Sequence, residues 1–198
     1  MSLYTFAPSP AFVSQGFTTW NDGFTDQDIA RIIEIGESRK IERAAIGDND
    51  RDSPDYRKSN VSWIDLREDS QWLYDKVGYI VRVLNGQFYR FDIFGFVEDF
   101  QFTIYEGEEG GHYDWHIDAN PNGHNASPRK LSFVLQLSDP VDYEGGELQL
   151  MNSKDPLVIK KQKGFAVVFP SYMLHRVTPV TKGIRKSLVV WTAGPAFR

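Results

Sequence analysis

The pattern of apolar residues after Gly86 constrains the fold most strongly, because it predicts many short strands. Residues 100–105 alternate Phe or Ile with Gln, Thr or Tyr, which is the two-residue period of a β-strand. Short apolar runs follow at 131–137, 165–169 and 188–191. Short strands at this spacing favour a sandwich or a jelly roll. Turn residues separate the runs: Gly110-Gly111, residues 120–128, Gly145-Gly146 and Gly183.

Two helices are predicted ahead of these strands. The first begins after Thr25, a good N-cap, and continues to Gly36. The second runs from about Asp69 to Leu84, and we expect Asn85-Gly86 to stop it. The supporting residues are the first-turn acids Asp26 and Asp28 and two apolar faces, formed by Ile29, Ile32 and Ile33 and by Leu73, Val77, Ile80 and Leu84. The fold class expected is therefore mainly β with flanking helices.

The length of 198 residues fits a single domain. We expect residues 1–99 to form a helical and strand support, and residues 100–194 to form the core with the active site. The absence of cysteine excludes disulfides, cysteine-ligated zinc, iron–sulfur clusters and thiol nucleophiles. A net charge of −5 argues against nucleic acid as the main partner. Neither a signal peptide nor a membrane-spanning apolar run is visible, so we expect a cytoplasmic protein without a membrane partner.

A histidine and an aspartate at His116-Ile117-Asp118 form the first candidate metal pair. Residues two apart on a strand point to the same face, so both side chains can converge on one point. One imidazole and one carboxylate are two thirds of a facial triad that holds iron(II) and leaves positions open. The third ligand must come from a distant strand, and His175 is suitably placed after a turn. His112 and His124 lie in turn-forming surroundings, and we expect them to be surface residues.

Arg185 is the candidate partner for a carboxylate. It follows His175 by ten positions, and residues 178–183 have the composition of a tight turn. A hairpin at this turn would place the strand of His175 beside the strand of Arg185. A guanidinium binds a carboxylate through two parallel, charge-assisted hydrogen bonds. A diacid bound to the metal at one end would need such a partner at the other, although an ordinary surface arginine is the alternative.

These motifs, in this order, resemble the 2-oxoglutarate- and iron(II)-dependent dioxygenases, specifically their prolyl 4-hydroxylase-like branch. The resemblance covers roughly residues 100–194, and Arg57-Lys58-Ser59 matches an Arg-x-Ser segment upstream. The segments that carry it are Tyr105-Glu106-Gly107, residues 113–118, Arg129-Lys130-Leu131-Ser132, residues 143–148, Phe169-Pro170-Ser171, residues 175–180 and residues 183–191.

The resemblance implies a double-stranded β-helix, or jelly roll, and a hydroxylase that uses Fe(II), 2-oxoglutarate and O2, with ascorbate as a further candidate. It implies His116, Asp118 and His175 as metal ligands and Arg185 as the partner of the distal carboxylate of 2-oxoglutarate. Tyr105 and Trp191 match residues near the co-substrate. Gln136 stands where many relatives have a second tyrosine, and its amide can donate a hydrogen bond. No acid–base side chain is required.

The substrate implied first is a peptidyl prolyl residue, and the loops Asp48–Lys58 and Ala119–Arg129 are expected to form the rim of its site. The alternatives are a free amino acid or another small molecule as substrate. A cupin-like metal-binding protein would use the same ligands without 2-oxoglutarate, and would have no need of Arg185. In a non-catalytic β-sandwich module, the spacing of His116, Asp118, His175 and Arg185 would be incidental. The sequence does not indicate an oligomeric state.

Overall fold

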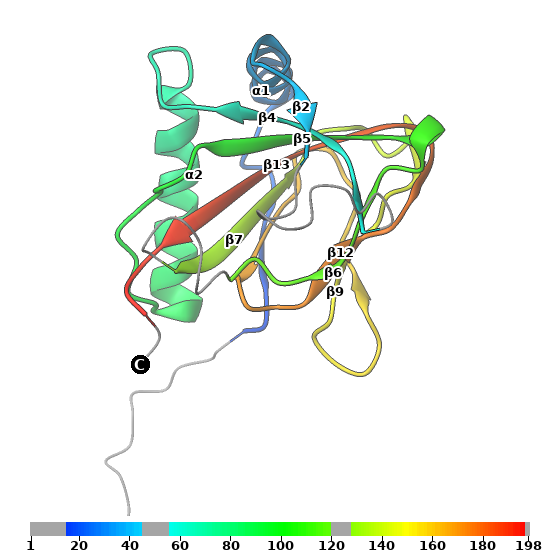
Figure 1. The fold of residues 1–198 in the computed structure, drawn as a ribbon. Coiled ribbons are helices and arrows are strands. Elements are labelled where there is room, and N and C mark those ends of the chain that lie inside the picture. Colours follow the sequence, from blue (N-terminus) through cyan, green and yellow to red (C-terminus); the bar gives the residue numbers. More distant parts are fainter. Residues whose placement is uncertain (1–14, 45–55, 120–127, 197–198) are drawn as a thin grey trace, which may run out of the picture.

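The computed structural model describes residues 15–44, 56–119 and 128–196. Two β-sheets face each other, and two helices cover the outer face of the larger sheet (Figure 1). The two helices are α1 (Asp26–Ser38) and α2 (Gln71–Leu84). Among the described residues, no helix is long and apolar enough to cross a membrane.

Helix α1 begins where the sequence predicts. Thr25 is its N-cap, and its hydroxyl accepts from the backbone N–H of Asp28 while the Asp28 carboxylate accepts from the Thr25 N–H, which is a capping box. Ile29 and Ile32 are buried in the core as the helical period requires.

The α-helical part of α2 ends at Leu84 as expected, but Asn85-Gly86 does not end the helical path. The chain continues as a π-helical turn, Asn85–Tyr89, and the left-handed residue that ends it is Arg90, with φ of 53°. The reason is local hydrogen bonding by Asn85: its carbonyl accepts from the Arg90 N–H, and its side-chain amide bonds both the N–H and the C=O of Phe91. These bonds fix the exit of the chain after Arg90 rather than at Gly86.

All strand pairs are antiparallel, and they form the two sheets of a jelly roll. The expected fold class, mainly β with flanking helices, is confirmed. The larger, eight-stranded sheet has the order β1-β11-β7-β13-β5-β4-β2, with β8 paired to β13: β1 (Thr18–Trp20), β2 (Glu42–Arg43), β4 (Asn60–Ile64), β5 (Phe100–Glu106), β7 (Arg129–Gln136), β8 (Tyr143–Gly145), β11 (Ala166–Pro170) and β13 (Val180–Ala193). The smaller sheet has the order β10-β9-β12-β6-β3: β3 (Arg57–Lys58), β6 (His112–His116), β9 (Leu148–Leu150), β10 (Leu157–Val158) and β12 (His175–Val177).

The alternation of side chains on the larger sheet decides which residues reach the space between the sheets. On β5, Phe100 and Phe102 pack under the helices, so Tyr105 points to the opposite face. On β7, Leu131, Phe133 and Leu135 belong to the same helix-side core. The inner face therefore receives the polar or aromatic residues of the central strands: Gln101, Thr103 and Tyr105 from β5, Ser132 and Gln136 from β7, and Arg185, Ser187 and Trp191 from β13.

The predicted hairpin between His175 and Arg185 is wrong. β12 pairs with β6 and β9 in the smaller sheet, whereas β13 pairs with β5, β7 and β8. Residues 180–183 do not turn back, because they pair with β8 and carry the chain from one sheet to the other. Gly183, with φ of +70°, bends β13 at a point where an added Cβ would meet the carbonyl oxygen of Asp142. His175 and Arg185 therefore belong to opposite sheets.

Candidate metal and carboxylate site

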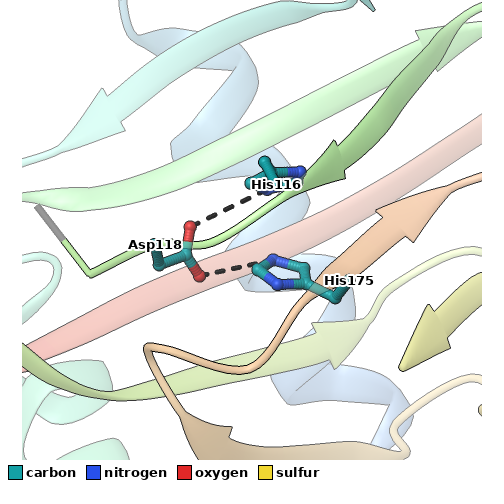
Figure 2. Close-up of side chains that lie close together, drawn as sticks. All are labelled: His116, Asp118 and His175. Carbon is teal, nitrogen blue, oxygen red and sulfur yellow. Dashed lines mark ion pairs between the residues drawn. The ribbon is translucent and has the colours of Figure 1, made fainter. Parts of the chain in front are cut away.

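Three buried side chains converge where β6 ends and β12 begins. His116 and His175 are register partners on these two strands, and Asp118 follows two residues after His116. The Asp118 carboxylate lies between them, with Oδ1 3.8 Å from His116 Nε2 and Oδ2 3.4 Å from His175 Nε2 (Figure 2). One ligand atom from each residue can be chosen so that all three lie within 4.8 Å of one another. The geometry is that of a site for one metal ion.

Backbone carbonyls fix the tautomers of both histidines. His116 Nδ1 lies 2.7 Å from the Asp114 carbonyl oxygen, and His175 Nδ1 lies 2.9 Å from that of Met173. A carbonyl can only accept, so each Nδ1 carries a proton, and Nε2 is the nitrogen of each ring that faces Asp118. The Tyr113 ring stacks on His116 with ring centroids 3.5 Å apart and restricts its rotation. Both imidazoles are therefore oriented as metal ligands.

The charges of these groups also suit a divalent cation. Burial, followed by the nearby His175, lowers the pKa of His116 to about 4, so this imidazole is neutral near pH 7. Burial alone would raise the pKa of Asp118, but the histidines and the hydrogen bond from Ser132 outweigh it and lower the pKa. Neutral imidazole nitrogens with an ionised carboxylate are the donor set of mononuclear iron(II) sites. The residues present thus fit the metal.

Arg185 is not a surface residue, because only 1% of it is exposed. Its Nη2 donates to Gln136 Oε1 at 2.9 Å, and its Nη1 makes a long contact of 3.4 Å with Ser187 Oγ. Its guanidinium carbon lies 5.2 Å from the centre of the Tyr105 ring. Within the described ranges, no carboxylate pairs with it. A buried cation without a counter-ion is strongly unfavourable, so this position fits an anionic ligand.

Unsatisfied donors surround the same end of the site. In the described part of the chain, Arg185 Nε and Gln136 Nε2 are buried without a hydrogen-bond partner. Tyr143 Oη is also buried and makes no hydrogen bond of good geometry, although the nearby Arg185 partly offsets the rise that burial causes in its pKa. Gly146 packs directly on this group, since an added Cβ would lie 2.9 Å from Arg185 Cδ and 3.2 Å from Tyr143 Cε2. Buried polar groups normally have partners, and a carboxylate offers several acceptor positions. These residues thus fit the distal carboxylate of 2-oxoglutarate.

A narrow cavity connects the triad with Arg185. His116, Asp118 and His175 line it together with Arg185, and its walls include Val134, Leu148, Val177 and Val189. Its volume is about 30 Å³, so the space between the triad and Arg185 is narrow. Outside lies a groove of about 430 Å³, which shares Asp118 and Trp191 with the cavity and is also lined by Arg57 and Arg129. The triad therefore lies between an interior cavity and an open groove.

The other residues predicted from the sequence to bind the co-substrate, Tyr105, Gln136 and Trp191, also lie near Arg185 or the triad. Tyr105 and Trp191 line the cavity, whereas Gln136 holds Arg185 from behind. Trp191 favours the ionised form of Asp118, although its Nε1–H makes no hydrogen bond of good geometry. Arg57 also lines the cavity, and its guanidinium carbon lies 4.4 Å from the centre of the Tyr113 ring.

The structure corrects the prediction that His112 is a surface residue, and it describes only part of the two predicted loops. His112 is half-buried in β6, where its Nδ1 lies 2.8 Å from the Gly110 carbonyl oxygen, because the strand begins one residue after the Gly110-Gly111 turn. The loop Asp48–Lys58 is partly strand, since Arg57–Lys58 pairs with β6. The rest of that loop up to residue 55, residues 120–127 of the second loop, and His124 lie outside the described residues.

Sequence reasoning missed Ser132, Ser171 and Tyr143 as members of the site. Ser132 could have been found, because it alternates on β7 with Leu131 and Phe133, which face the helices, and so points into the space between the sheets. Nothing in the local pattern marks Tyr143, whose strand β8 joins the sheet, within the described ranges, by pairing with β13.

Comparison with known proteins agrees with this geometry. Residues 100–193 match the sequence profile of the 2OG-Fe(II) oxygenase superfamily. A PKHD-type hydroxylase of Synechococcus sp. (strain CC9311) is 41% identical over 92 residues, which are 46% of this chain and 40% of that protein. A PKHD-type hydroxylase of Pseudoalteromonas atlantica is 39% identical over 95 residues, 46% of this chain and 41% of that protein. The chain thus spans about two fifths of the length of these relatives.

Two solved structures share the fold. A Trichoplax adhaerens prolyl hydroxylase, in complex with a peptide fragment of the hypoxia inducible factor oxygen degradation domain, superposes with a TM-score of 0.74 at 22% identity, covering 90% of this chain and 84% of that one. The viral collagen prolyl hydroxylase of Paramecium Bursaria Chlorella virus-1 has a TM-score of 0.67 at 20% identity, covering 91% and 97% of the two chains.

Proposed function

Because residues 100–193 of this chain belong to the 2OG-Fe(II) oxygenase superfamily, we propose that the protein is an iron(II)- and 2-oxoglutarate-dependent hydroxylase of the prolyl 4-hydroxylase-like type. The observation that carries the proposal is the pairing of two sites in one cavity. At one end, two imidazoles and a carboxylate converge, and at the other a buried arginine lacks a counter-ion among the described residues. A cupin-like protein without 2-oxoglutarate has no use for this arginine.

In this proposal, His116, Asp118 and His175 hold iron(II), and Arg185 binds the distal carboxylate of 2-oxoglutarate. When bound, the iron and 2-oxoglutarate supply with O2 the oxidising power that hydroxylates an unactivated carbon and releases succinate and carbon dioxide. The chain orients these groups rather than moving protons. Gln136 holds the guanidinium, Tyr105 packs beside it, and the valines and leucine of the cavity wall exclude water.

We propose a peptidyl prolyl residue as the substrate. The support is the peptide complex formed by the Trichoplax adhaerens neighbour and the open groove beside Asp118, which can receive an extended chain. A free amino acid or another small molecule is the second candidate. A single domain with its core in residues 100–194, and a cytoplasmic location, remain predictions.

The test is succinate release in the presence of iron(II), 2-oxoglutarate and O2, with mass spectrometry of each candidate substrate. The panel contains proline-containing peptides, the same peptides with alanine in place of proline, and free amino acids. We expect a gain of one oxygen atom in a proline-containing peptide and none with His175→Ala. Oxygen added to a free amino acid instead would establish the second candidate, and no succinate from any member would contradict the proposal.

A further inference from the structure

Asp118 needs support that the two histidines do not need. His116 and His175 lie on hydrogen-bonded strands, whereas Asp118 lies beyond the end of β6. Its side chain is nonetheless held, because the Ser132 hydroxyl lies 2.7 Å from Asp118 Oδ2. The Ser171 hydroxyl lies 3.0 Å from that of Ser132, and both serines are 0% exposed. The hydroxyls of two fully buried serines therefore form a chain of hydrogen bonds that ends at the carboxylate.

The direction of these hydrogen bonds is fixed by chemistry. An ionised carboxylate only accepts, so the single hydroxyl proton of Ser132 is donated to Asp118. Ser132 Oγ can then only accept from Ser171, whose hydroxyl is the donor of the second bond. The chain of donation runs from Ser171 through Ser132 to Asp118 Oδ2. The other carboxylate oxygen, Oδ1, faces His116 and lies 3.8 Å from its Nε2.

The backbone of Ser171 also holds Asp118. Its carbonyl accepts from the N–H groups of Asp118 at 2.9 Å and Ala119 at 2.7 Å, and its own N–H donates to the Lys130 carbonyl. Ser171 also belongs to the turn that leads to His175, in which Met173 orients the His175 ring. One short turn thus helps to position both Asp118, which follows β6, and His175, which begins β12.

We propose that Ser132 and Ser171 are positioning residues of the metal site: they form a relay that keeps Asp118 oriented toward the two histidines before the metal binds. This inference rests on the proposed function only in taking the triad as a metal site. Hydrogen-bonded partners of metal ligands typically change metal affinity by about 10- to 100-fold when they are removed. Ser132 contacts the carboxylate directly and should have the larger effect.

The test compares substitutions that differ only in the hydroxyl. Ser132→Thr and Ser132→Val have nearly the same shape, so any steric effect is common to both, and the hydroxyl alone separates them. Ser171→Ala removes the outer member of the relay. The matched control is Ser62→Ala, because Ser62 is also 0% exposed and its hydroxyl donates to the Gly36 carbonyl at 2.6 Å, beneath α1. Thermal unfolding of each metal-free protein reports the loss of stability separately.

Iron(II) affinity is measured without oxygen and without 2-oxoglutarate, by competition with a chromogenic chelator, and cobalt(II) absorption reports the ligand geometry. We expect Ser132→Val to bind iron(II) about 10- to 100-fold more weakly than Ser132→Thr and to change the cobalt spectrum. Ser171→Ala should have a smaller effect, and Ser62→Ala should lower the melting temperature but leave the iron affinity at the wild-type value. The double variant Ser132→Val with Ser171→Ala should bind no more weakly than Ser132→Val alone, because the relay acts through Ser132.

Equal iron affinities of Ser132→Thr and Ser132→Val would overturn the relay, and leave the oxygenase proposal intact. Conversely, a wild type that binds iron(II) but not 2-oxoglutarate would overturn the proposed function without touching the relay. A wild type that binds no iron(II) would overturn both.

Discussion

The metal end of the cavity is ordered mainly by hydrogen bonds between close neighbours in the sequence, whereas the Arg185 end depends on strands far apart in the sequence. His116 and His175 each bond a carbonyl two residues earlier, at Asp114 and Met173. Arg185, in contrast, donates to Gln136, which lies 49 positions away on β7. Asp118 is intermediate, because its position relies on Ser132 and Ser171.

This difference has a consequence for function. The side chains that would bind the metal are different from the one that would bind the carboxylate, and the cavity lies between them. Substitutions at one end should therefore change one affinity and spare the other.

The largest effect is expected for His175→Ala. Removing one of three ligands leaves two, which hold a divalent ion poorly, so iron(II) affinity should fall by more than the roughly 100-fold typical of losing a partner of a ligand. The matched control is His112→Ala, since His112 lies on β6 but outside the triad. Metal analysis after anaerobic reconstitution measures both variants. Full iron occupancy in His175→Ala would remove that residue from the site.

Arg185→Ala should act on the other end alone. Losing one partner of a desolvated charge pair costs about 2–5 kcal/mol, so 2-oxoglutarate should bind on the order of thirty-fold to several-thousand-fold more weakly. Arg185→Lys should be milder, because it keeps the charge and loses the two-pronged geometry. Anaerobic titration of 2-oxoglutarate into the iron-loaded proteins measures this. Iron affinity without 2-oxoglutarate should stay at the wild-type value, and an unchanged dissociation constant for 2-oxoglutarate would contradict the assignment.

Gln136→Leu should have a smaller effect in the same direction. The substitution keeps the approximate volume but removes the acceptor that holds Arg185 Nη2, so the guanidinium is less well fixed. A hydrogen bond to a charged group contributes about 1.5–3 kcal/mol, and we expect 2-oxoglutarate affinity to fall by roughly tenfold. The same titration applies, with iron affinity again as the control. A tighter 2-oxoglutarate complex would mean that Gln136 competes with the carboxylate for Arg185.

The smallest effect is expected for a substitution outside the metal and Arg185 ends of the cavity, in the first turn of α1. Burial alone would raise the pKa of Asp28, but hydrogen bonds from Lys76 and Thr25 outweigh it and hold the pKa below 3.8. Asp28→Ala should lower the free energy of unfolding by up to about 1 kcal/mol at pH 7, because it removes a carboxylate from the first turn of α1. Because the folded pKa is depressed, this stabilisation is present above pH 3.8 and is lost as the pH falls through the folded value.

Chemical denaturation of the wild type and of Asp28→Ala at several pH values measures this difference. Asp26→Ala is the control, since Asp26 lies in the same first turn but its side chain is 84% exposed. A difference between wild type and Asp28→Ala that persists unchanged below the folded pKa would contradict the assignment, as would any change in iron or 2-oxoglutarate affinity.

The parts of the molecule that sequence analysis predicted well are those that short-range periodicity determines. The capping box at Thr25, the strand at 100–106 and the convergence of His116 with Asp118 all follow from spacings of two to four residues. Arg185 does line the cavity with the triad, but the hairpin expected to bring it beside His175 does not form. A Gly-containing segment with Pro179 reads as a tight turn, whereas its pairing with β8 makes it a crossing between sheets.

The remaining features depend on contacts that no local pattern contains. The π-helical turn after Leu84 arises because one side chain, Asn85, bonds the backbone of Phe91. Tyr143 is part of the site because β8 pairs with β13. Ser171 is part of it because its carbonyl accepts a hydrogen bond from the Asp118 N–H. Such contacts follow from the complete topology rather than from residue spacing.

The central claim is that the triad and Arg185 serve the two ends of one ligand. The most direct test is to titrate iron(II)-loaded wild-type protein, without oxygen, with 2-oxoglutarate and separately with 2-oxopentanoate, while following the metal-to-ligand absorption band. The second compound keeps the oxo-acid end and the five carbons but lacks the distal carboxylate. We predict that both produce the band and that 2-oxoglutarate binds on the order of thirty-fold or more tightly. Equal affinities, or no band with either compound, would contradict the account.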